Sequence, residues 1–246
     1  MDKDKVLLVT GGSRGIGAAV VRLAAMRGFR VILSYVKDDH AARALRDEVP
    51  GNAVTIVKGD VADVAGVARI FDAVDDVKLP LTGLVNNAGI VGQIAPFTEY
   101  TRERLQRTFN VNILGAFECA QQAVTRMLSH GQGGAIVNVS SAAARIGSPN
   151  EFIDYAASKG AIDTLTLGLA KEYGPQGIRV NAVRPGIIDT SIHAAAGDAG
   201  RVARFSGQVP LRRAGEPEEV ADTIMWLLSE QSTYVTGALL DVAGGR

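Results

Sequence analysis

The chain has little of several features that mark particular classes of protein. Its 246 residues include one cysteine, one tryptophan and eight prolines, and 26 lysines and arginines balance 26 aspartates and glutamates. A single cysteine cannot form an internal disulfide bond or a cysteine-based zinc site, which excludes a disulfide-stapled framework. The balanced charge argues against a protein whose main task is to grip nucleic acid phosphates or an anionic membrane.

Long apolar runs are also missing. No stretch approaches the roughly 18 apolar residues that a membrane-spanning helix needs, and the apolar run after residues 2–5 is too short for the core of a signal peptide. His40, His130 and His193 are scattered without the spacing of metal ligands. We therefore expect a cytoplasmic protein with no metal, no membrane partner and no nucleic acid partner.

Short apolar runs alternate regularly with longer helical stretches, and apolar residues make up 47% of the chain. The alternation predicts strands over residues 6–10, 31–34, 54–57, 83–86, 135–140, 178–183 and 239–242, and helices over 16–27, 39–49, 64–77, 102–128 and 155–173. Apolar strands separated by helices indicate a parallel sheet covered on both faces. Because no linker or repeat interrupts the pattern, we predict one α/β domain over residues 1–246.

One long stretch breaks the alternation. Residues 185–217 combine small residues with several arginines and show no strand or helix pattern. Such a stretch in a compact domain is usually functional, and we predict a substrate lid over about residues 188–215. The lid arginines are Arg201, Arg204, Arg212 and Arg213. We expect them to be solvated charges, with contact to an anionic substrate as the alternative.

A glycine-rich turn joins the first strand to the first helix, in the segment Thr10-Gly11-Gly12-Ser13-Arg14-Gly15-Ile16-Gly17. Gly11 permits a tight turn, and Gly15 and Gly17 let the main chain approach a pyrophosphate closely. The start of the helix adds free N–H groups and the positive end of its dipole. The turn therefore predicts a dinucleotide site, with an ordinary strand-to-helix turn as the alternative.

The glycine spacing, with three residues between Gly11 and Gly15 and one before Gly17, resembles that of the short-chain dehydrogenases/reductases. Three further segments resemble the same family: Asn-Asn-Ala-Gly at 86–89, Tyr-Ala-Ala-Ser-Lys at 155–159 and Arg-Pro-Gly at 184–186. The chain is thus similar to 3-oxoacyl-carrier-protein reductases and glucose dehydrogenases over nearly its whole length. The resemblance implies a Rossmann fold, that is, a doubly wound, seven-stranded parallel sheet with helices on both faces, and a homotetramer or homodimer.

Tyr155 and Lys159 stand four residues apart in a predicted helix and so share one face. A phenol has a pKa near 10, and we expect the nearby ammonium group to lower the pKa of Tyr155. Tyr155 is then suited to act as the general acid of carbonyl reduction or the base of alcohol oxidation. The three-residue gap, by resemblance, fits carbonyl and alcohol chemistry rather than the reduction of enoyl double bonds.

The resemblance supplies further catalytic roles. Ser141, which follows the fifth predicted strand, is expected to bind the substrate oxygen, and Ser140 is the neighbouring alternative. Asn112 is expected to hold a water molecule that links Lys159 to solvent. Lys159 is also expected to bond the hydroxyl groups of the nicotinamide ribose and orient the ring.

The end of the second predicted strand bears on which nicotinamide cofactor is bound. NAD users commonly place an acid about 20 residues past the glycine loop, and this chain has Tyr35 there. Arg14 in the loop, with Ser34 and Lys37 at the strand end, would suit the 2′-phosphate of NADP(H). We therefore predict NADP(H), while the acidic pair Asp38-Asp39 leaves NAD(H) as the alternative.

Further cofactor contacts follow from the resemblance: Asp60 and Val61 at the adenine, residues 87–89 along its ribose, and residues 185–190 near the nicotinamide amide. The full predicted cofactor set is Gly11, Ser13, Arg14, Gly15, Ile16, Gly17, Ser34, Tyr35, Lys37, Asp60, Val61, Asn87, Ala88, Gly89, Tyr155, Lys159, Pro185, Gly186, Ile188 and Thr190. Asn86 is expected to tie strands together instead.

The sequence thus predicts an oxidoreductase that moves a hydride between NADP(H) and a small carbonyl or secondary-alcohol substrate. An NAD(H)-dependent sugar or polyol dehydrogenase is one alternative. A protein of another class, which senses NADP(H) without turning it over, is the second alternative. The complete set of Ser141, Tyr155 and Lys159 argues against the sensor, because a sensor has no use for an activated phenol.

Overall fold

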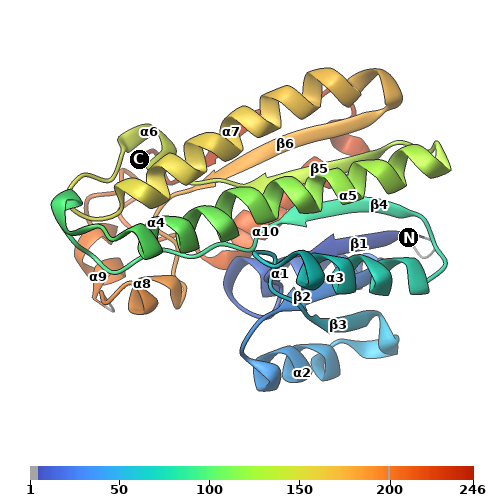
Figure 1. Cartoon of the computed structure of the whole chain (residues 1–246), viewed down its shortest axis with the longest axis horizontal. Coiled ribbons are helices and arrows are strands. Elements are labelled where there is room, and N and C mark those ends of the chain that lie inside the picture. The colour runs from blue at the N-terminus through green and yellow to red at the C-terminus, as the bar shows by residue number, and fades with distance from the viewer. Residues whose placement is uncertain (1–4, 199) are drawn as a thin grey trace.

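A computed structural model of the chain describes residues 5–198 and 200–246. Seven parallel strands form one sheet in the order β3-β2-β1-β4-β5-β6-β7, which confirms the predicted doubly wound fold (Figure 1). The strands are β1 (Val6–Val9), β2 (Arg30–Tyr35), β3 (Val54–Lys58), β4 (Leu81–Asn86), β5 (Gly134–Val139), β6 (Ile178–Pro185) and β7 (Leu239–Val242). Each lies within about three residues of a predicted strand.

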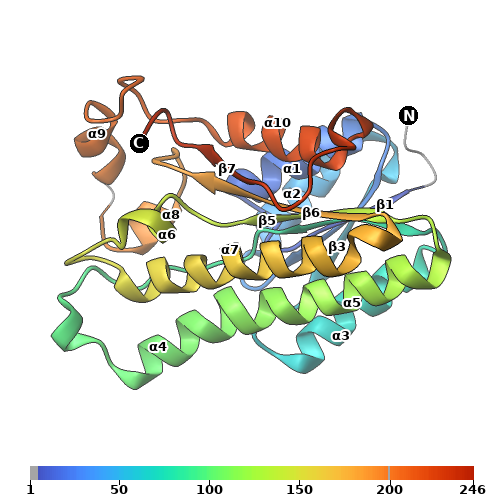
Figure 2. The ribbon, with the colours of Figure 1, turned by 90° about the horizontal axis from the view of Figure 1, so that it is seen from above.

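Helices cover both faces of the sheet, with α1, α2 and α10 on one face and α3, α5 and α7 on the other (Figure 2). The helices are α1 (Gly15–Met26), α2 (Asp39–Glu48), α3 (Val64–Asp76), α4 (Arg102–Phe109), α5 (Gly115–His130), α6 (Ala143–Ile146), α7 (Ile153–Tyr173), α8 (Ile192–Ala195), α9 (Arg201–Ser206) and α10 (Pro217–Leu228). None of the helices in the described ranges is long and apolar enough to span a bilayer.

The apolar strands are buried on both sides. In β1, Leu7 and Val9 pack into the cluster with α1 and α10, whereas Val6 and Leu8 pack into the cluster with α3 and α5. Successive side chains of a strand point to opposite faces. A strand with helices on both faces therefore has no side that faces solvent, which is why short, mainly apolar runs predicted the sheet correctly.

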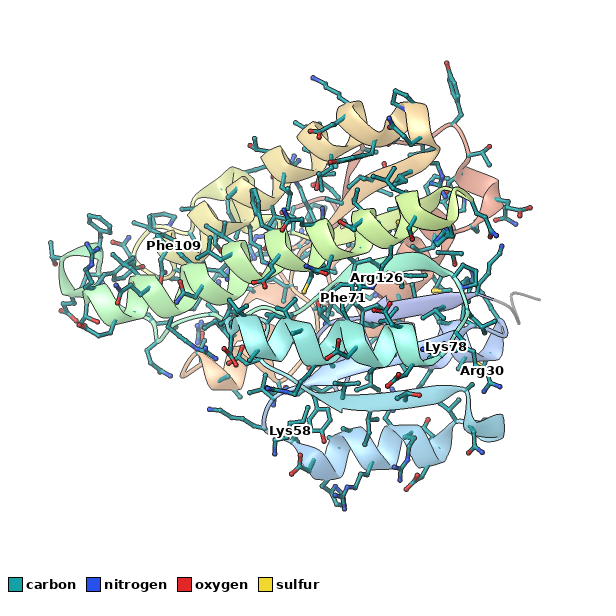
Figure 3. All side chains as sticks on the ribbon, turned by 45° about the vertical axis from the view of Figure 1, so that its right-hand side comes forward. Arg30, Lys58, Phe71, Lys78, Phe109 and Arg126 are labelled. Atoms are coloured by element: carbon teal, nitrogen blue, oxygen red, sulfur yellow. The ribbon has the colours of Figure 1, made fainter. Side chains whose placement is uncertain are left out.

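A cation on α5 reinforces the packing against α3. The guanidinium carbon of Arg126 lies 4.7 Å from the ring centroid of Phe71, and the two side chains face each other in Figure 3. Arg126 also pairs with Asp75 at 2.6 Å. The layer of helices below the sheet thus combines a buried apolar face with polar contacts at its outer edge.

The helical region predicted over residues 102–128 is interrupted in the structure. A π-helical turn, Asn110–Leu114, separates α4 from α5 and carries the buried Asn112. Such turns insert one extra residue into a helix and often lie at functional sites. The continuous helix expected over residues 102–128 is therefore wrong at this turn, where the structure has two helices.

The stretch predicted as irregular, residues 185–217, contains the short helices α8 and α9. Its ends are joined: Asp189 N–H donates to the Gly215 oxygen, and Gly215 N–H donates to the Ile187 oxygen, both at 2.9 Å. Residues 188–215 therefore leave the sheet and return to the same point. The following helix, α10, was not predicted, although Pro217 at its start and the capping box of Glu216 and Glu219 signal it.

Gly66 in α3 allows that helix to pack against the loop after β3. An ideal Cβ atom at Gly66 would lie 2.1 Å from the main-chain oxygen of Asp60. We expect Gly66→Ala to lower the free energy of unfolding by about 1–3 kcal/mol, because the main chain must shift to admit the methyl group. Urea denaturation followed by circular dichroism measures this change.

Gly168→Ala in α7 is the matched control, since nothing lies within 4 Å of a Cβ atom there. It should raise the free energy of unfolding by about 0.5–1 kcal/mol, because alanine loses less main-chain freedom than glycine in a helix. If Gly66→Ala were as stable as the wild type, the close packing of α3 against Asp60 would be refuted.

Candidate active site

A groove of about 500 Å³ runs along the edge of the sheet where the carboxyl ends of the strands meet. The chain direction of the crossovers reverses between β1 and β4, and open α/β sheets bind ligands at such a switch point. Predicted cofactor contacts that line this groove are Gly11, Ser13, Arg14, Gly15, Ile16, Ser34, Tyr35, Lys37, Asp60, Val61, Asn87, Ala88, Gly89 and Thr190. The structure thus brings most of the predicted set to one surface.

The start of α1 forms one wall of the groove. Gly11 and Gly15 have φ values of +63° and +54°, a conformation that side chains other than glycine rarely adopt. Side chains cap the starts of α2, α3 and α4, but no described side chain caps α1. Its first N–H groups therefore fit the oxygens of a dinucleotide pyrophosphate, which would accept hydrogen bonds from them.

Asn87 ties the glycine loop to the loop that follows β4. Its side-chain amide donates to the main-chain oxygens of Thr10 and Gly11, each at 2.9 Å. In return, the Thr10 hydroxyl accepts from the N–H groups of Asn87 and Ala88, each at 3.0 Å. Asn87 lines the groove as predicted, but its amide is committed to the main chain.

Both acids near the end of β2 are engaged by other groups. Asp38 accepts a hydrogen bond from Ala41 N–H at the start of α2. The Lys58 ammonium, 3.0 Å away, and the Tyr35 hydroxyl together hold the pKa of Asp39 below its usual value. Arg14 and Lys37, in contrast, are exposed and form no ion pair with a described residue. The groove therefore presents two cations at this end that are not held in ion pairs with described residues.

Ser141, Tyr155 and Lys159 come together where α7 crosses the end of β5. The Ser141 hydroxyl and Tyr155 line the same pocket, and the hydroxyl is near enough to the phenol to act on its pKa. Lys159 Nζ lies 5.6 Å from the ring centroid of Tyr155 and donates to the Val139 oxygen at 2.7 Å. Ser140 instead donates to the main-chain oxygen of Lys159 at 3.1 Å. Of the two serines, Ser141 is the one placed beside the phenol.

The pKa of Tyr155 differs from the expectation. Burial raises the pKa of Tyr155, and the neighbouring Ser141 hydroxyl acts in the opposite direction without overcoming it. The expected lowering by Lys159 is wrong for this structure, because its ammonium group faces the Val139 carbonyl. Burial also lowers the pKa of Lys159 to about 8, although the Asp163 carboxylate raises it.

Asn112 clamps the chain beside Lys159. Its side-chain oxygen accepts from Ile90 N–H at 2.8 Å, and its amide donates to the Ile90 oxygen and to Ser158. A Cβ atom at Gly89 would lie 3.4 Å from Lys159 Nζ and 3.5 Å from the Asn112 oxygen, so the two groups flank this glycine. The role expected for Asn112, which is to hold a water molecule that links Lys159 to solvent, stays a prediction.

A pocket of about 130 Å³ adjoins the groove. Val91, Thr190 and Ile192 line both cavities, which therefore meet at these residues. Predicted residues on the pocket wall are Ser141, Tyr155, Pro185, Gly186, Ile188 and Thr190. The remaining predicted residues, Gly17, Asn112 and Lys159, lie behind the walls and are buried.

Comparison with known proteins adds to this geometry. A family model described as enoyl-(acyl carrier protein) reductase matches residues 11–246. YgfF of Escherichia coli strain K12, described as an uncharacterized oxidoreductase, is 48% identical over 98% of this chain and 99% of its own. A solved structure described as a short chain dehydrogenase/reductase family protein is 33% identical, with a TM-score of 0.87 over 100% of this chain and 98% of that one.

The chain belongs to the short-chain dehydrogenase/reductase family. A further solved structure, 3-ketoacyl-(acyl-carrier-protein) reductase from Brucella melitensis complexed with NADH, is 29% identical and covers 99% of this chain and 98% of its own, with a TM-score of 0.93. The protein is therefore an oxidoreductase of a family that acts on alcohols and carbonyl compounds with nicotinamide cofactors.

This short-chain dehydrogenase/reductase also contains a buried ion pair next to Tyr155 that the sequence analysis missed. The Asp154 carboxylate, whose side chain is 0% exposed, accepts hydrogen bonds from Arg104 at 2.8 and 2.9 Å. Arg104 donates further to the Gln93 oxygen, and the Gln93 amide donates to the Ala195 oxygen at 2.9 Å. A line of contacts thus joins the start of α7 to residues 188–215.

The expectation that the arginines of residues 188–215 are solvated is wrong for Arg201. Its side chain is 7% exposed and holds Glu151 through two hydrogen bonds of 2.6 and 2.7 Å. Arg204 forms an ion pair with Asp198, and the exposed Arg213 pairs with Glu219. Glu151 lies 50 residues from Arg201 in the sequence, so no local sequence pattern could predict that the two residues pair.

The Arg104–Asp154 pair has a predictable pH signature. Burial alone would raise the pKa of Asp154, but hydrogen bonds from Arg104, from Tyr155 N–H and from Thr108 hold it below its usual value. The stabilisation is therefore complete above the unfolded pKa, near 4, and is lost as the pH falls through the lowered folded value. We expect Arg104→Gln to lower the free energy of unfolding by about 3–5 kcal/mol at pH 7, because it strands a buried carboxylate.

In Arg104→Gln, burial raises the pKa of Asp154, so the loss relative to the wild type should shrink as the pH falls toward about 4. Denaturation at several pH values measures this trend. Arg22→Gln, which breaks the exposed pair with Glu48, is the control and should cost at most about 1 kcal/mol. A loss that grew on acidification would contradict the assignment.

Proposed function

We propose that the protein is an NADP(H)-dependent reductase of small carbonyl compounds, which also oxidises the corresponding secondary alcohols. One observation carries the proposal: Ser141 and Tyr155 line a pocket that opens into the dinucleotide groove at Val91 and Thr190. A substrate oxygen at these two hydroxyl groups would therefore have its carbon next to a nicotinamide in the groove.

In this proposal the bound cofactor supplies or accepts the hydride. The Ser141 hydroxyl holds the substrate oxygen and stabilises the charge that develops on it. Tyr155 gives its phenolic proton to that oxygen in reduction and takes it back in oxidation. Because burial raises the pKa of Tyr155, the phenol is protonated at neutral pH, which is the form that reduction requires.

Lys159 and Asn112 support this proton transfer. Lys159, with a pKa of about 8, exists in both protonation states near neutral pH and can return a proton toward Tyr155. It also orients the nicotinamide ribose, and Asn112 positions the water that connects Lys159 with solvent across Gly89. The closeness of both groups to Gly89 supports this relay.

Carbonyl reduction is favoured over enoyl reduction, although the matching family model carries an enoyl reductase description. Ser141 and Tyr155 line the same small pocket and can present two hydroxyl groups to a single substrate oxygen. A carbonyl oxygen becomes an alkoxide at that point, so both groups stabilise the product of hydride transfer. A solved relative is described as a 3-ketoacyl reductase, whose name also refers to a carbonyl substrate.

The choice of NADP(H) is supported by the charges at the end of β2. Arg14 and Lys37 are the exposed cations on that part of the groove, and neither pairs with an acid in the described ranges. Asp39, in contrast, is paired with Lys58, and Asp38 caps α2. A 2′-phosphate would be attracted by the two cations, whereas the two acids that could accept from a 2′-hydroxyl group are partly engaged, Asp39 by Lys58 and Asp38 by the start of α2.

Tyr155→Phe tests the chemistry. The variant should lower kcat by about 10²–10⁴-fold, because it lacks the transferable proton, and should bind the reduced cofactor as the wild type does. Consumption of NADPH with ketones, 3-oxoacyl thioesters and enoyl thioesters measures turnover. Tyr234→Phe, at a fully exposed position, is the control. Substantial turnover by Tyr155→Phe, or activity on enoyl thioesters alone, would refute the mechanism.

Arg14→Gln tests the cofactor. We expect about a tenfold weaker affinity for NADPH, equivalent to about 1.4 kcal/mol, and less than about a twofold change for NADH, because only NADPH carries the 2′-phosphate. Fluorescence titration with both cofactors measures the affinities. Arg69→Gln removes an exposed charge from α3, away from the groove, and should alter neither affinity. Tighter binding of NADH than NADPH by the wild type would overturn the NADP(H) assignment.

A further inference from the structure

Arg246 places a cation on the wall of the pocket that holds Ser141 and Tyr155. The C-terminal end of the chain lies beside α6 (Figures 1 and 2), where Arg145 donates to the main-chain oxygen of Arg246 at 3.0 Å. The guanidinium carbon of Arg246 lies 5.6 Å from the ring centroid of Phe205. In the described ranges, no carboxylate pairs with this guanidinium group and no acceptor is hydrogen-bonded to it.

The other cations around this end of the pocket are all neutralised. Glu151 holds Arg201 through two hydrogen bonds, Asp198 pairs with Arg204, and Asp241 pairs with Arg145 at 3.1 Å. Arg246 is therefore the charge left over. Its partial burial lowers its pKa, and the positive charge of Arg201 acts in the same direction, while the Glu151 carboxylate, which Arg201 already holds, opposes both without overcoming them. A half-buried guanidinium group that forms a ring contact with Phe205 but no ion pair is costly, and an anionic ligand would offset that cost.

The remainder of the pocket is small and largely apolar. Val91, Ile146, Phe152 and Ile187 contribute to its walls, and its volume is about 130 Å³. The polar side chains on its walls are the hydroxyl groups of Ser140, Ser141, Ser148, Tyr155 and Thr190 and the two arginines, Arg201 and Arg246. Such an arrangement fits a compact ligand with an apolar body, an oxygen at one end and an anion at the other.

We propose that the substrate is a small oxo or hydroxy carboxylic acid whose carboxylate is bound by Arg246. This assignment rests on the proposed function for the other end of the pocket and adds a specificity-determining residue to it. A planar guanidinium group can hold a carboxylate through two parallel hydrogen bonds. In reduction the carbonyl carbon gains the hydride and its oxygen gains the proton, the cofactor is oxidised, and the carboxylate passes through unchanged.

Binding of two isosteric probes tests the proposal without requiring turnover. Cyclohexanecarboxylate and cyclohexanecarboxamide have nearly the same shape and differ in charge. Calorimetry on the enzyme loaded with the oxidised cofactor that it binds more tightly should show the acid bound at least tenfold more tightly than the amide. Arg246→Gln should abolish this preference, and Arg246→Lys should retain part of it, because lysine keeps the charge but not the fork of donors.

Arg69→Gln on α3 is the control and should keep the preference for the acid. Wild-type enzyme that binds the acid no more tightly than the amide, or that binds neither, would overturn the proposal, as would an unchanged preference in Arg246→Gln. Turnover of 4-oxocyclohexanecarboxylate and its methyl ester gives a second readout: Arg246→Gln should lower the ratio of their kcat/KM values about tenfold or more.

The failure of this inference is distinguishable from failure of the proposed function. Tyr155→Phe should lose turnover and keep the tenfold preference for the acid, since Tyr155 transfers a proton but does not contact the carboxylate. Reduction of neutral ketones without any effect of Arg246→Gln on the acid would leave the proposed function standing and refute the role of Arg246. Binding of the acid through Arg246 in an enzyme without reductase activity would support the role of Arg246 and refute the proposed function.

Discussion

The hydrogen bonds from the Asn87 amide to the main-chain oxygens of Thr10 and Gly11 hold the two sides of the candidate active site together. They join the loops after β1 and β4 at the point where the crossover connections diverge to opposite sides of the sheet. Without them, two partly buried carbonyl groups would lose their partners, at a cost of about 1–3 kcal/mol each. The shape of the groove, and the distance of the glycine loop from Gly89, follow from this constraint.

A second chain of polar contacts carries the same constraint across to α7. Asn86 in β4 donates to the Asn138 side chain in β5 at 3.1 Å, and Asn138 donates to the Thr166 hydroxyl at 2.9 Å. The predicted tie between strands at Asn86 is thus confirmed. A buried amide group without a hydrogen-bond partner destabilises the folded protein. The complete series of hydrogen bonds from Asn86 to Thr166 therefore favours one register of β4, β5 and α7. That register places Tyr155 at the end of the groove.

The sequence was informative where function depends on local spacing. The apolar strands, the glycine loop and the four-residue interval from Tyr155 to Lys159 all lie within single segments of the chain. It was uninformative about pairs such as Arg104–Asp154 and Arg201–Glu151, because charged residues carry no periodic signal that identifies a partner 50 residues away. The sequence also could not predict the direction in which the pKa of Tyr155 shifts, because the phenol becomes buried only when β5, β6 and α7 pack around it.

Zero net charge has a more specific meaning once the ion pairs are known. Most of the arginines around the catalytic pocket are matched by acids that the fold delivers from distant segments, as Glu151 is to Arg201. Within the described ranges, Arg14 and Lys37 at one end of the combined cavity and Arg246 at the other lack such acids. Because the total charge is balanced, the protein as a whole is not positively charged. The positive charge is instead local, at Arg14 and Lys37 in one place and at Arg246 in the other. Val91 and Ile192 line the cavity where groove and pocket meet, and a hydride transfer benefits when the charged parts of both reactants are held at the ends and the reacting carbons lie in the middle.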